Sequence, residues 1–153
     1  MEQYFALLRQ CPLFQGISPQ ELSQMLPCLG TRHMQVKKHQ MIFRAGDPAR
    51  WVGLVLSGAV HVIQEDYYGN RSIVSTFQPP QLFGEAFACA GVASLPVSVE
   101  AAQDSTLLLL DCQRVIRTCS DACAFHQRLL SNLLHVVAAK NLLLTQKLSF
   151  LSK

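Results

Sequence analysis

The sequence predicts a mainly β protein, a double-stranded β-helix (jelly-roll) barrel with flanking helices and one long C-terminal helix. First, its 153 residues, half of them hydrophobic and 15% charged, suit one globular domain with a real core. Second, residues 31–110 consist of short runs typical of strands, separated by turn signals. Third, no proline or glycine follows Pro96, and the pattern is helical from Gln113 to the end.

A helix precedes the predicted strands. Ser18 has the residue type of a helix N-cap, Pro19 suits the first helical position, and Glu21 stands three residues after the cap. This capping box predicts a helix over residues 19–26. A shorter helical pattern, with apolar residues between positions 4 and 8, lies before it.

Seven short runs have the composition of strands, and turn residues such as Ala45-Gly46-Asp47-Pro48 and Ser57-Gly58 separate them. The runs are His33–Val36, Met41–Phe43, Val52–Ser57, Ala59–Glu65, Ser72–Phe77, Val97–Ala102 and Thr106–Asp111. Residues 68–71 should form a hairpin tip, because Gly69 and Asn70 tolerate a positive φ. Strands of this length and spacing favour a compact antiparallel barrel.

The last helical stretch carries an apolar repeat with alternating steps of four and three. Its members are Leu130, Leu134, Val137, Asn141, Leu144, Leu148 and Leu151. Such a repeat is the a/d seam of a coiled coil, and an Asn at an a position fixes register and strand number. The repeat therefore predicts a homodimer formed through this helix. The alternative is that the same stripe packs on the chain's own barrel.

Two segments, Leu82–Ala88 and Pro96–Ala101, carry a family resemblance. With the order helix, barrel, long helix, they closely resemble the sensor half of the Crp/Fnr family of bacterial transcription regulators. The resemblance implies a cyclic-nucleotide-binding-like barrel with its N-terminal helices over residues 1–112 and C-terminal helices, including the dimerisation helix, over residues 113–153. It further implies that DNA is contacted only through a helix-turn-helix domain beyond residue 153.

In that family the two segments, which are residues 82–88 and 96–101 here, form the phosphate-binding cassette. Gly84 allows a close approach of the backbone to a ligand, and a short helix opening near Glu85 would aim free amides at an anion. The resemblance implies that Glu85 accepts a hydrogen bond from a ribose hydroxyl. Val97, however, stands where cyclic-nucleotide binders carry the arginine that pairs with the phosphate. Losing that pair costs on the order of several kcal/mol, so we expect weak or no binding of cyclic AMP and cyclic GMP.

The expected ligand is therefore an unidentified small molecule that is apolar or weakly charged. The candidate ligand-binding residues are Phe83, Gly84, Glu85, Ala86, Phe87, Cys89, Val97, Ser98 and Asn141. Ser98 matches the family's phosphate-contacting hydroxyl, but it should not restore nucleotide binding alone. Asn141 has two candidate roles, fixing the register of the coiled coil and contacting the ligand.

Six cysteines are present, namely Cys11, Cys28, Cys89, Cys112, Cys119 and Cys123. Without an export signal they should stay reduced, and we expect structural buried thiols. Two alternatives remain open. One is a metal or cluster site on a helix face that carries Cys119, Cys123 and His126. The other is a thiol sensor of oxidants, formed by Cys89 or by the Cys119/Cys123 pair.

Several function classes are disfavoured. The net charge is only +3 and the basic residues are scattered, so this segment alone should not bind DNA. No stretch is long and apolar enough to span a bilayer, and no signal peptide is present, which favours a cytoplasmic protein. Because no catalytic motif or metal quartet appears, we expect neither an enzyme nor a cofactor. The rivals are a cyclic-nucleotide-binding regulatory domain of a channel or kinase and a cupin-like metalloenzyme.

Overall fold

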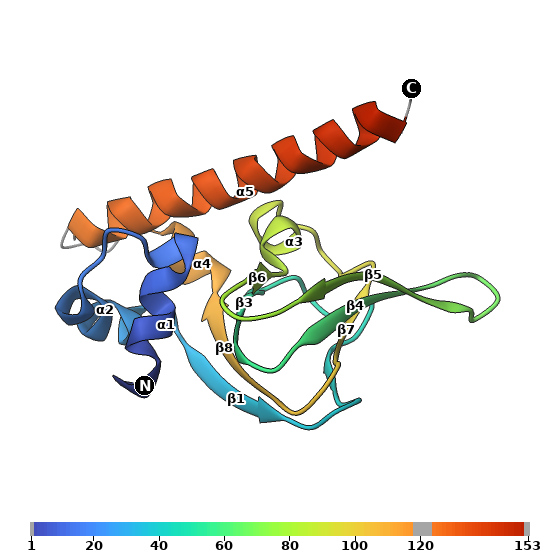
Figure 1. Ribbon diagram of the computed structural model, residues 1–153, viewed down its shortest axis with the longest axis horizontal. Helices are drawn as coiled ribbons and strands as arrows, with labels where there is room; N and C mark the ends of the chain where they lie inside the picture. The colour runs from blue at the N-terminus through green and yellow to red at the C-terminus, as the bar shows by residue number, and fades with distance from the viewer. Residues whose placement is uncertain (1, 118–123, 152–153) are drawn as a thin grey trace.

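The computed structural model describes residues 2–117 and 124–151. Two four-stranded antiparallel sheets form the barrel, in the orders β1-β8-β3-β6 and β2-β7-β4-β5. Short helices gather at one end of the barrel, and a single long helix runs across them (Figure 1). The predicted jelly-roll with flanking helices and a long C-terminal helix is confirmed.

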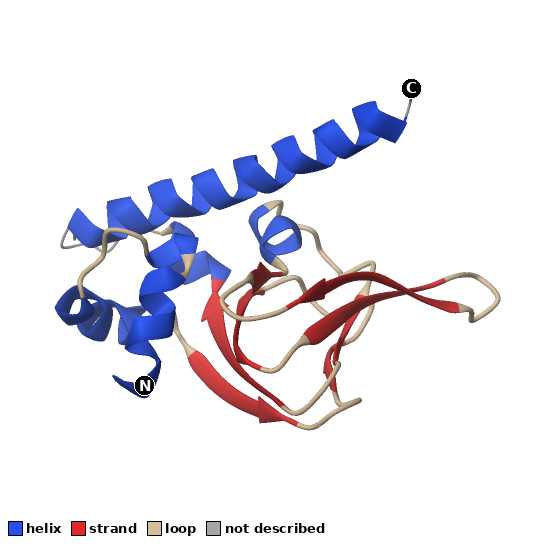
Figure 2. Cartoon of the chain, viewed as in Figure 1, coloured by secondary structure: helices blue, strands red, loops and turns tan. Residues whose placement is uncertain are grey.

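The strands are β1 (Arg32–Val36), β2 (Met41–Phe43), β3 (Trp51–Ser57), β4 (Val60–Glu65), β5 (Arg71–Phe77), β6 (Leu82–Phe83), β7 (Ser98–Ala101) and β8 (Ser105–Asp111). The α-helices are α1 (Phe5–Gln10), α2 (Pro19–Met25), α3 (Glu85–Cys89), α4 (Cys112–Ile116) and α5 (Ala124–Leu151). Three 3-10 helices, η1 (Glu2–Tyr4), η2 (Pro12–Phe14) and η3 (Leu26–Leu29), complete the N-terminal part. Figure 2 separates these helices from the strands by colour.

The predicted capping box is present at the start of α2. The Ser18 hydroxyl accepts a hydrogen bond from the Glu21 amide at 3.2 Å, and the Glu21 carboxylate accepts one from the Ser18 amide at 3.0 Å. All seven predicted strands occur within a residue or two of their expected bounds. The structure contains one further strand, β6, which was not predicted because two residues are too few for an alternating pattern.

The two central strands β3 and β8 are buried on both faces. Leu54 and Leu108 point to one side, into an apolar cluster shared with the helices. Val55 and Leu107 point to the other side, into the interior of the barrel. This alternation follows from the period of two along a strand. The sheet therefore separates a helical core from a barrel core.

The long helix α5 has two apolar faces. Leu129, Leu133 and Val136 are buried in the helical core and follow one another at steps of four and three. By contrast, Leu134, Leu144 and Leu148 of the predicted seam are 71%, 56% and 59% exposed. The chain's own core is thus covered by a second stripe beside the predicted seam. Leu130 and Val137, which belong to the N-terminal half of the seam, are partly buried.

Polar contacts fix the N-terminal half of α5 to the N-terminal helices. The Asn132 side-chain amide donates to the carbonyl oxygens of Leu13 and Gln15, at 2.9 and 2.8 Å. One turn earlier, Arg128 donates to the carbonyl oxygen of Gly16.

Within residues 2–117 and 124–151, no helix has the length and hydropathy needed to cross a membrane.

Candidate functional site

The first cassette segment is a strand, a sharp turn and a short helix. β6 ends at Phe83, Gly84 adopts a left-handed conformation with a φ of 79°, and α3 begins at Glu85. A Cβ atom at position 84 would lie 3.2 Å from the Trp51 carbonyl oxygen, in a conformation that side-chain-bearing residues rarely adopt. The predicted glycine turn and short helix are thus both present.

Glu85 is buried, with 4% of its surface exposed, and it faces α5. The Lys140 ammonium donates a hydrogen bond to one carboxylate oxygen, Oε1, and forms an ion pair with it. The same ammonium donates to the Leu82 carbonyl oxygen at 2.9 Å and lies 5.2 Å from the centre of the Phe77 ring. The Lys140 side chain therefore bonds the middle of α5 to the cassette.

The second oxygen of Glu85, Oε2, is buried and has no hydrogen-bond partner within the described part of the chain. A buried carboxylate oxygen without a donor costs free energy, since the water that it would bind is excluded. This atom can therefore accept a hydrogen bond from a further donor group.

The second cassette segment lines the barrel interior through alternate residues. Val97 is 8% exposed and, like Val99, belongs to the apolar barrel core. Phe87 packs against the same core, and the Phe83 ring lies directly over Gly53, where a Cβ atom would stand 2.2 Å from the ring. The lining next to the family's arginine position is apolar, as the sequence predicts.

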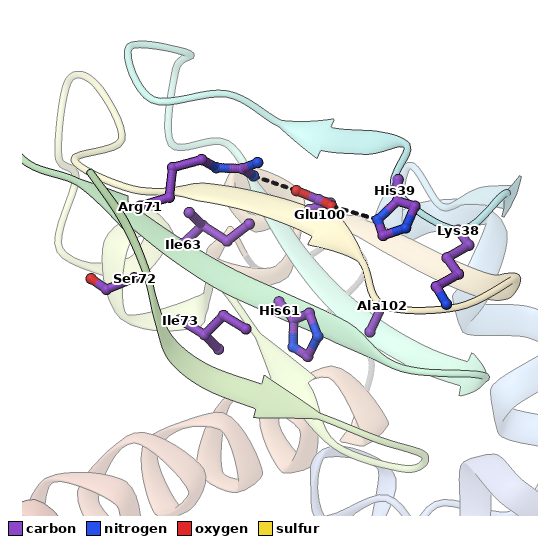
Figure 3. A pocket seen from close by; sticks show the side chains of 9 residues that line it. All are labelled: Lys38, His39, His61, Ile63, Arg71, Ser72, Ile73, Glu100 and Ala102. Atoms are coloured by element: carbon purple, nitrogen blue, oxygen red, sulfur yellow. Dashed lines mark hydrogen bonds and ion pairs between the residues drawn. The ribbon is translucent and has the colours of Figure 1, made fainter. Parts of the chain in front are cut away.

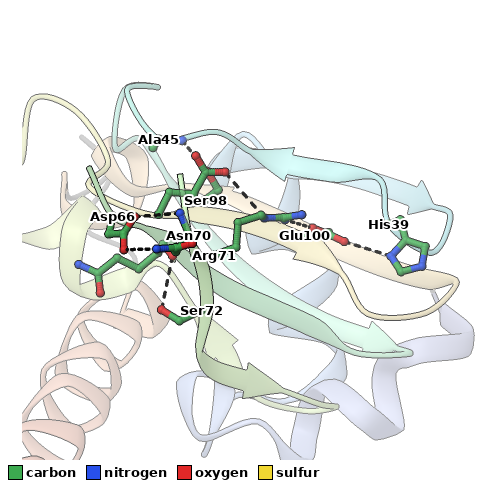
Figure 4. Close-up of polar contacts among 10 residues, drawn as sticks. His39, Ala45, Asp66, Asn70, Arg71, Ser72, Ser98 and Glu100 are labelled. Carbon is green, nitrogen blue, oxygen red and sulfur yellow. Dashed lines mark hydrogen bonds and ion pairs between the residues drawn. The ribbon is translucent and has the colours of Figure 1, made fainter. Parts of the chain in front are cut away.

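Ser98 lies on the opposite face of β7 from Val97 and Val99. Its hydroxyl accepts a hydrogen bond from the backbone amide of Ala45 at 2.9 Å (Figure 4). In this structure the hydroxyl therefore holds the turn before β3, and it does not face the space next to Val97.

Three other candidate residues also lie apart from the barrel interior. Ala86 is exposed. Cys89 packs against the helical core, where its Sγ atom is 3.9 Å from that of Cys112. Asn141 is exposed on α5 and accepts a hydrogen bond from the Thr145 hydroxyl with its backbone carbonyl. Its neighbour Lys140, which lies outside the predicted seam, reaches the cassette instead.

A groove of about 490 Å³ lies on the outer face of the β2-β7-β4-β5 sheet (Figure 3). Glu100 stands in its wall between Arg71 and the His39 ring, which is 3.1 Å away. The Arg71 guanidinium, followed by His39, lowers the pKa of the Glu100 carboxyl. Because Glu100 and Val99 point to opposite faces of β7, this groove is separate from the cassette.

The histidine of the alternative metal site has a structural partner. His126 is buried and its Nε2 atom donates to the Val115 carbonyl oxygen at 2.8 Å. Cys119 and Cys123 lie outside the described residues. Among the residues that the structure does describe, no group of three His, Cys, Asp or Glu side chains could hold a metal ion.

The fold and the cassette agree with comparisons with known proteins. The family described as "Cyclic nucleotide-binding domain" matches residues 33–121, which is more than half of the chain. The chain belongs to this family. No curated protein sequence matches this cyclic nucleotide-binding domain significantly.

The solved structures that resemble this domain include transcription regulators of the Crp/Fnr family. The catabolite activator protein of Thermus thermophilus shares 25% identity and a TM-score of 0.73 over 92% of this chain and 63% of its own. The sensor domain of the regulator DNR from Pseudomonas aeruginosa shares 20% identity and a TM-score of 0.74 over 97% and 93%. The domain thus spans less than two thirds of the first of these chains.

A kinase subunit shares the fold as well. The regulatory subunit of a cAMP-independent protein kinase A from Trypanosoma brucei has 19% identity and a TM-score of 0.69, over 91% of this chain and 46% of its own. The names of these three neighbours describe regulatory proteins, and the likeness shows that this chain shares their fold.

The contact between α5 and the cassette predicts a measurable coupling between Lys140 and Glu85. Lys140→Ala should lower the free energy of unfolding by about 1–3 kcal/mol, because it leaves the Glu85 carboxylate buried without its cation. In a Glu85→Gln background the same change should cost much less. Urea unfolding of the four proteins measures both costs, with Lys147→Ala as the control from an exposed position of α5. Equal costs in the two backgrounds would show that the pair has no energetic role.

Proposed function

We propose that this chain is the effector-sensing and dimerisation part of a Crp/Fnr-type transcription regulator. It binds a small molecule other than cyclic AMP inside the barrel and relays binding to a DNA-binding domain beyond residue 153. The observation that carries the proposal is the position of Glu85, a buried carboxylate of the cassette that is bonded to Lys140 of the long helix.

The lining of the cassette argues against a cyclic phosphate as the effector. Val97 offers no charge or donor, and a buried phosphate needs both. The Lys140 ammonium occupies one oxygen of Glu85, and the other oxygen, Oε2, can still accept a hydrogen bond from a donor group. The apolar residue at position 97 is therefore the feature that weakens nucleotide binding.

The same lining favours a molecule with an apolar body and at least one hydrogen-bond donor. Phe83, Phe87 and Val97 provide an apolar wall, and such walls bind the bulk of most small ligands. Oε2 of Glu85 supplies an acceptor that fixes orientation. The effector class is therefore a weakly charged or apolar metabolite with a hydroxyl or amino group.

The relay would operate through Lys140. A ligand that donates to Glu85 changes the surroundings of the ion pair, and α5 is attached to the cassette through that pair. Binding then favours one position of α5 over another, and a coupling of about 1–3 kcal/mol is enough for a useful switch.

Dimerisation would use the exposed apolar face of α5. Leu134, Leu144 and Leu148 project from the side of the helix that its own core leaves uncovered. Asn141 is exposed on the same seam, where it is available for its proposed role in fixing register. Leu130 and Val137 extend the seam towards the core, and Leu151 belongs to it in the sequence.

Calorimetric titration tests the nature of the effector. With the unmodified chain, cyclic AMP and cyclic GMP should give no saturable heat at micromolar concentrations. Lys140→Met should not restore binding, since Val97 remains. A submicromolar dissociation constant for either nucleotide would make the chain a cyclic nucleotide receptor and contradict the proposed effector class.

Sedimentation equilibrium tests the dimer. The unmodified chain should be a dimer at micromolar concentrations, and Leu144→Arg should shift it to monomers by placing a charge in the seam. Gln146→Arg is the matched control, because position 146 is exposed and lies off the a/d stripe, so this variant should remain dimeric. A wild-type monomer at high concentration, or equal effects of the two arginines, would contradict dimerisation through this seam.

A further inference from the structure

Two thiols from separate helices lie next to each other at the base of the cassette. Cys89 is the last residue of α3 and Cys112 is the first residue of α4. Their Sγ atoms are 3.9 Å apart, close enough for one thiol to donate to the other. The chain between them runs through β7 and β8, so the fold alone brings them together.

We propose that Cys89 and Cys112 form a reversible intramolecular disulfide when the chain meets a hydroperoxide such as hydrogen peroxide. The two sulfur atoms need to approach from 3.9 Å to about 2.05 Å, the length of an S–S bond. Rotation about the side-chain torsion angles of the cysteines can supply much of that movement.

The two thiols differ in ways that assign their roles. Cys89 is partly exposed, whereas Cys112 is 1% exposed and so is screened from an oxidant in solution. The hydrogen bond from the Cys112 thiol lowers the pKa of Cys89, and the same hydrogen bond, together with burial, raises the pKa of Cys112. Because the thiolate is the nucleophile, Cys89 reacts first and Cys112 resolves the product.

The reaction balances in two steps. The Cys89 thiolate attacks one peroxide oxygen, the O–O bond breaks, and Cys89 becomes a sulfenic acid as hydroxide leaves and takes up a proton to form water. The Cys112 sulfur then attacks the sulfenic sulfur, the S–O bond breaks, and the departing hydroxide takes up the Cys112 proton as a second water. Overall, two thiols are oxidised to one disulfide and one hydrogen peroxide is reduced to two waters.

The other described cysteines lack this arrangement. Cys11 is fully buried in the helical core, and burial raises its pKa to about 11, which suppresses its thiolate. Cys28 is exposed and its thiol approaches the Gln24 carbonyl oxygen at 3.9 Å. In the described ranges 2–117 and 124–151, Cys89 and Cys112 are thus the two cysteines whose thiols contact each other.

The Cys89–Cys112 disulfide would join the two helices α3 and α4, which both contact the long helix of the proposed relay. α3 begins with Glu85, which bonds to Lys140, and α4 packs against α5. A disulfide between α3 and α4 therefore fixes the cassette helix relative to the beginning of the long helix. Its formation does not depend on which effector the barrel binds, so it can be tested independently of the proposed function.

Peptide mapping after peroxide treatment tests the inference on the whole chain. The oxidised protein should lose the mass of two hydrogen atoms, regain it with dithiothreitol, and yield a linked peptide pair containing Cys89 and Cys112. Cys89→Ser should abolish the linked pair, and the change sits at a partly exposed site that a serine tolerates. Cys28→Ser is the matched control and should form the bridge as the unmodified chain does.

A trapping experiment tests the order of the steps. In Cys112→Ala the sulfenic acid at Cys89 has no resolving thiol, so dimedone should label Cys89 far more than in the unmodified chain. Linked peptides that join Cys89 or Cys112 to Cys119 or Cys123 instead would overturn the inference. So would oxidation of the thiols of the unmodified chain to sulfinic acids without any bridge.

Discussion

The ion pair between Glu85 and Lys140 connects the two parts of this molecule. Glu85 opens the short cassette helix, and its carboxylate is almost entirely removed from water. A charge in that position needs a cation and hydrogen bonds to compensate its lost hydration. Lys140 supplies the cation, and its other contacts with Leu82 and Phe77 hold the ammonium in place. The cassette and the long helix thereby share one electrostatic contact.

The long helix can serve two partners because its two apolar stripes lie on different faces. A helix of 28 residues is about 42 Å long, and a stripe with steps of three and four covers only part of its circumference. Leu129, Leu133 and Val136 cover the chain's own core, and Lys140 continues this stripe one turn further. The second stripe, with Leu144 and Leu148, is free for a second subunit. A movement of the first stripe must move the second.

Much of this architecture can be predicted from the sequence, since local rules specify it. The capping box at Ser18 and the glycine turn at Gly84 involve only neighbouring residues, and the strands follow from their alternating pattern. The family assignment rests on the two cassette segments and is confirmed by the match over residues 33–121. The apolar environment of Val97 also follows from its strand position.

The candidate ligand-binding residues do not all face one space, because their side chains differ in direction although they are close in the sequence. Successive residues of a helix turn by about 100°, so Phe87 and Cys89 point to different sides of α3 and cannot line one space. Likewise, Ser98 alternates with Val97 and Val99 on β7. Lys140 was missed because one coiled-coil stripe was sought on α5, whereas the helix carries two. Its position four residues after Val136 is the signal that would have found it.

Hydrogen–deuterium exchange of α5 tests most directly whether Glu85 holds this helix to the cassette. The account predicts that Glu85→Gln speeds exchange of the backbone amides around residues 137–144, while the amides around Leu129 keep their protection because the helical core is unchanged. Identical exchange in the two proteins would contradict the account, since α5 would then be held in place without Glu85.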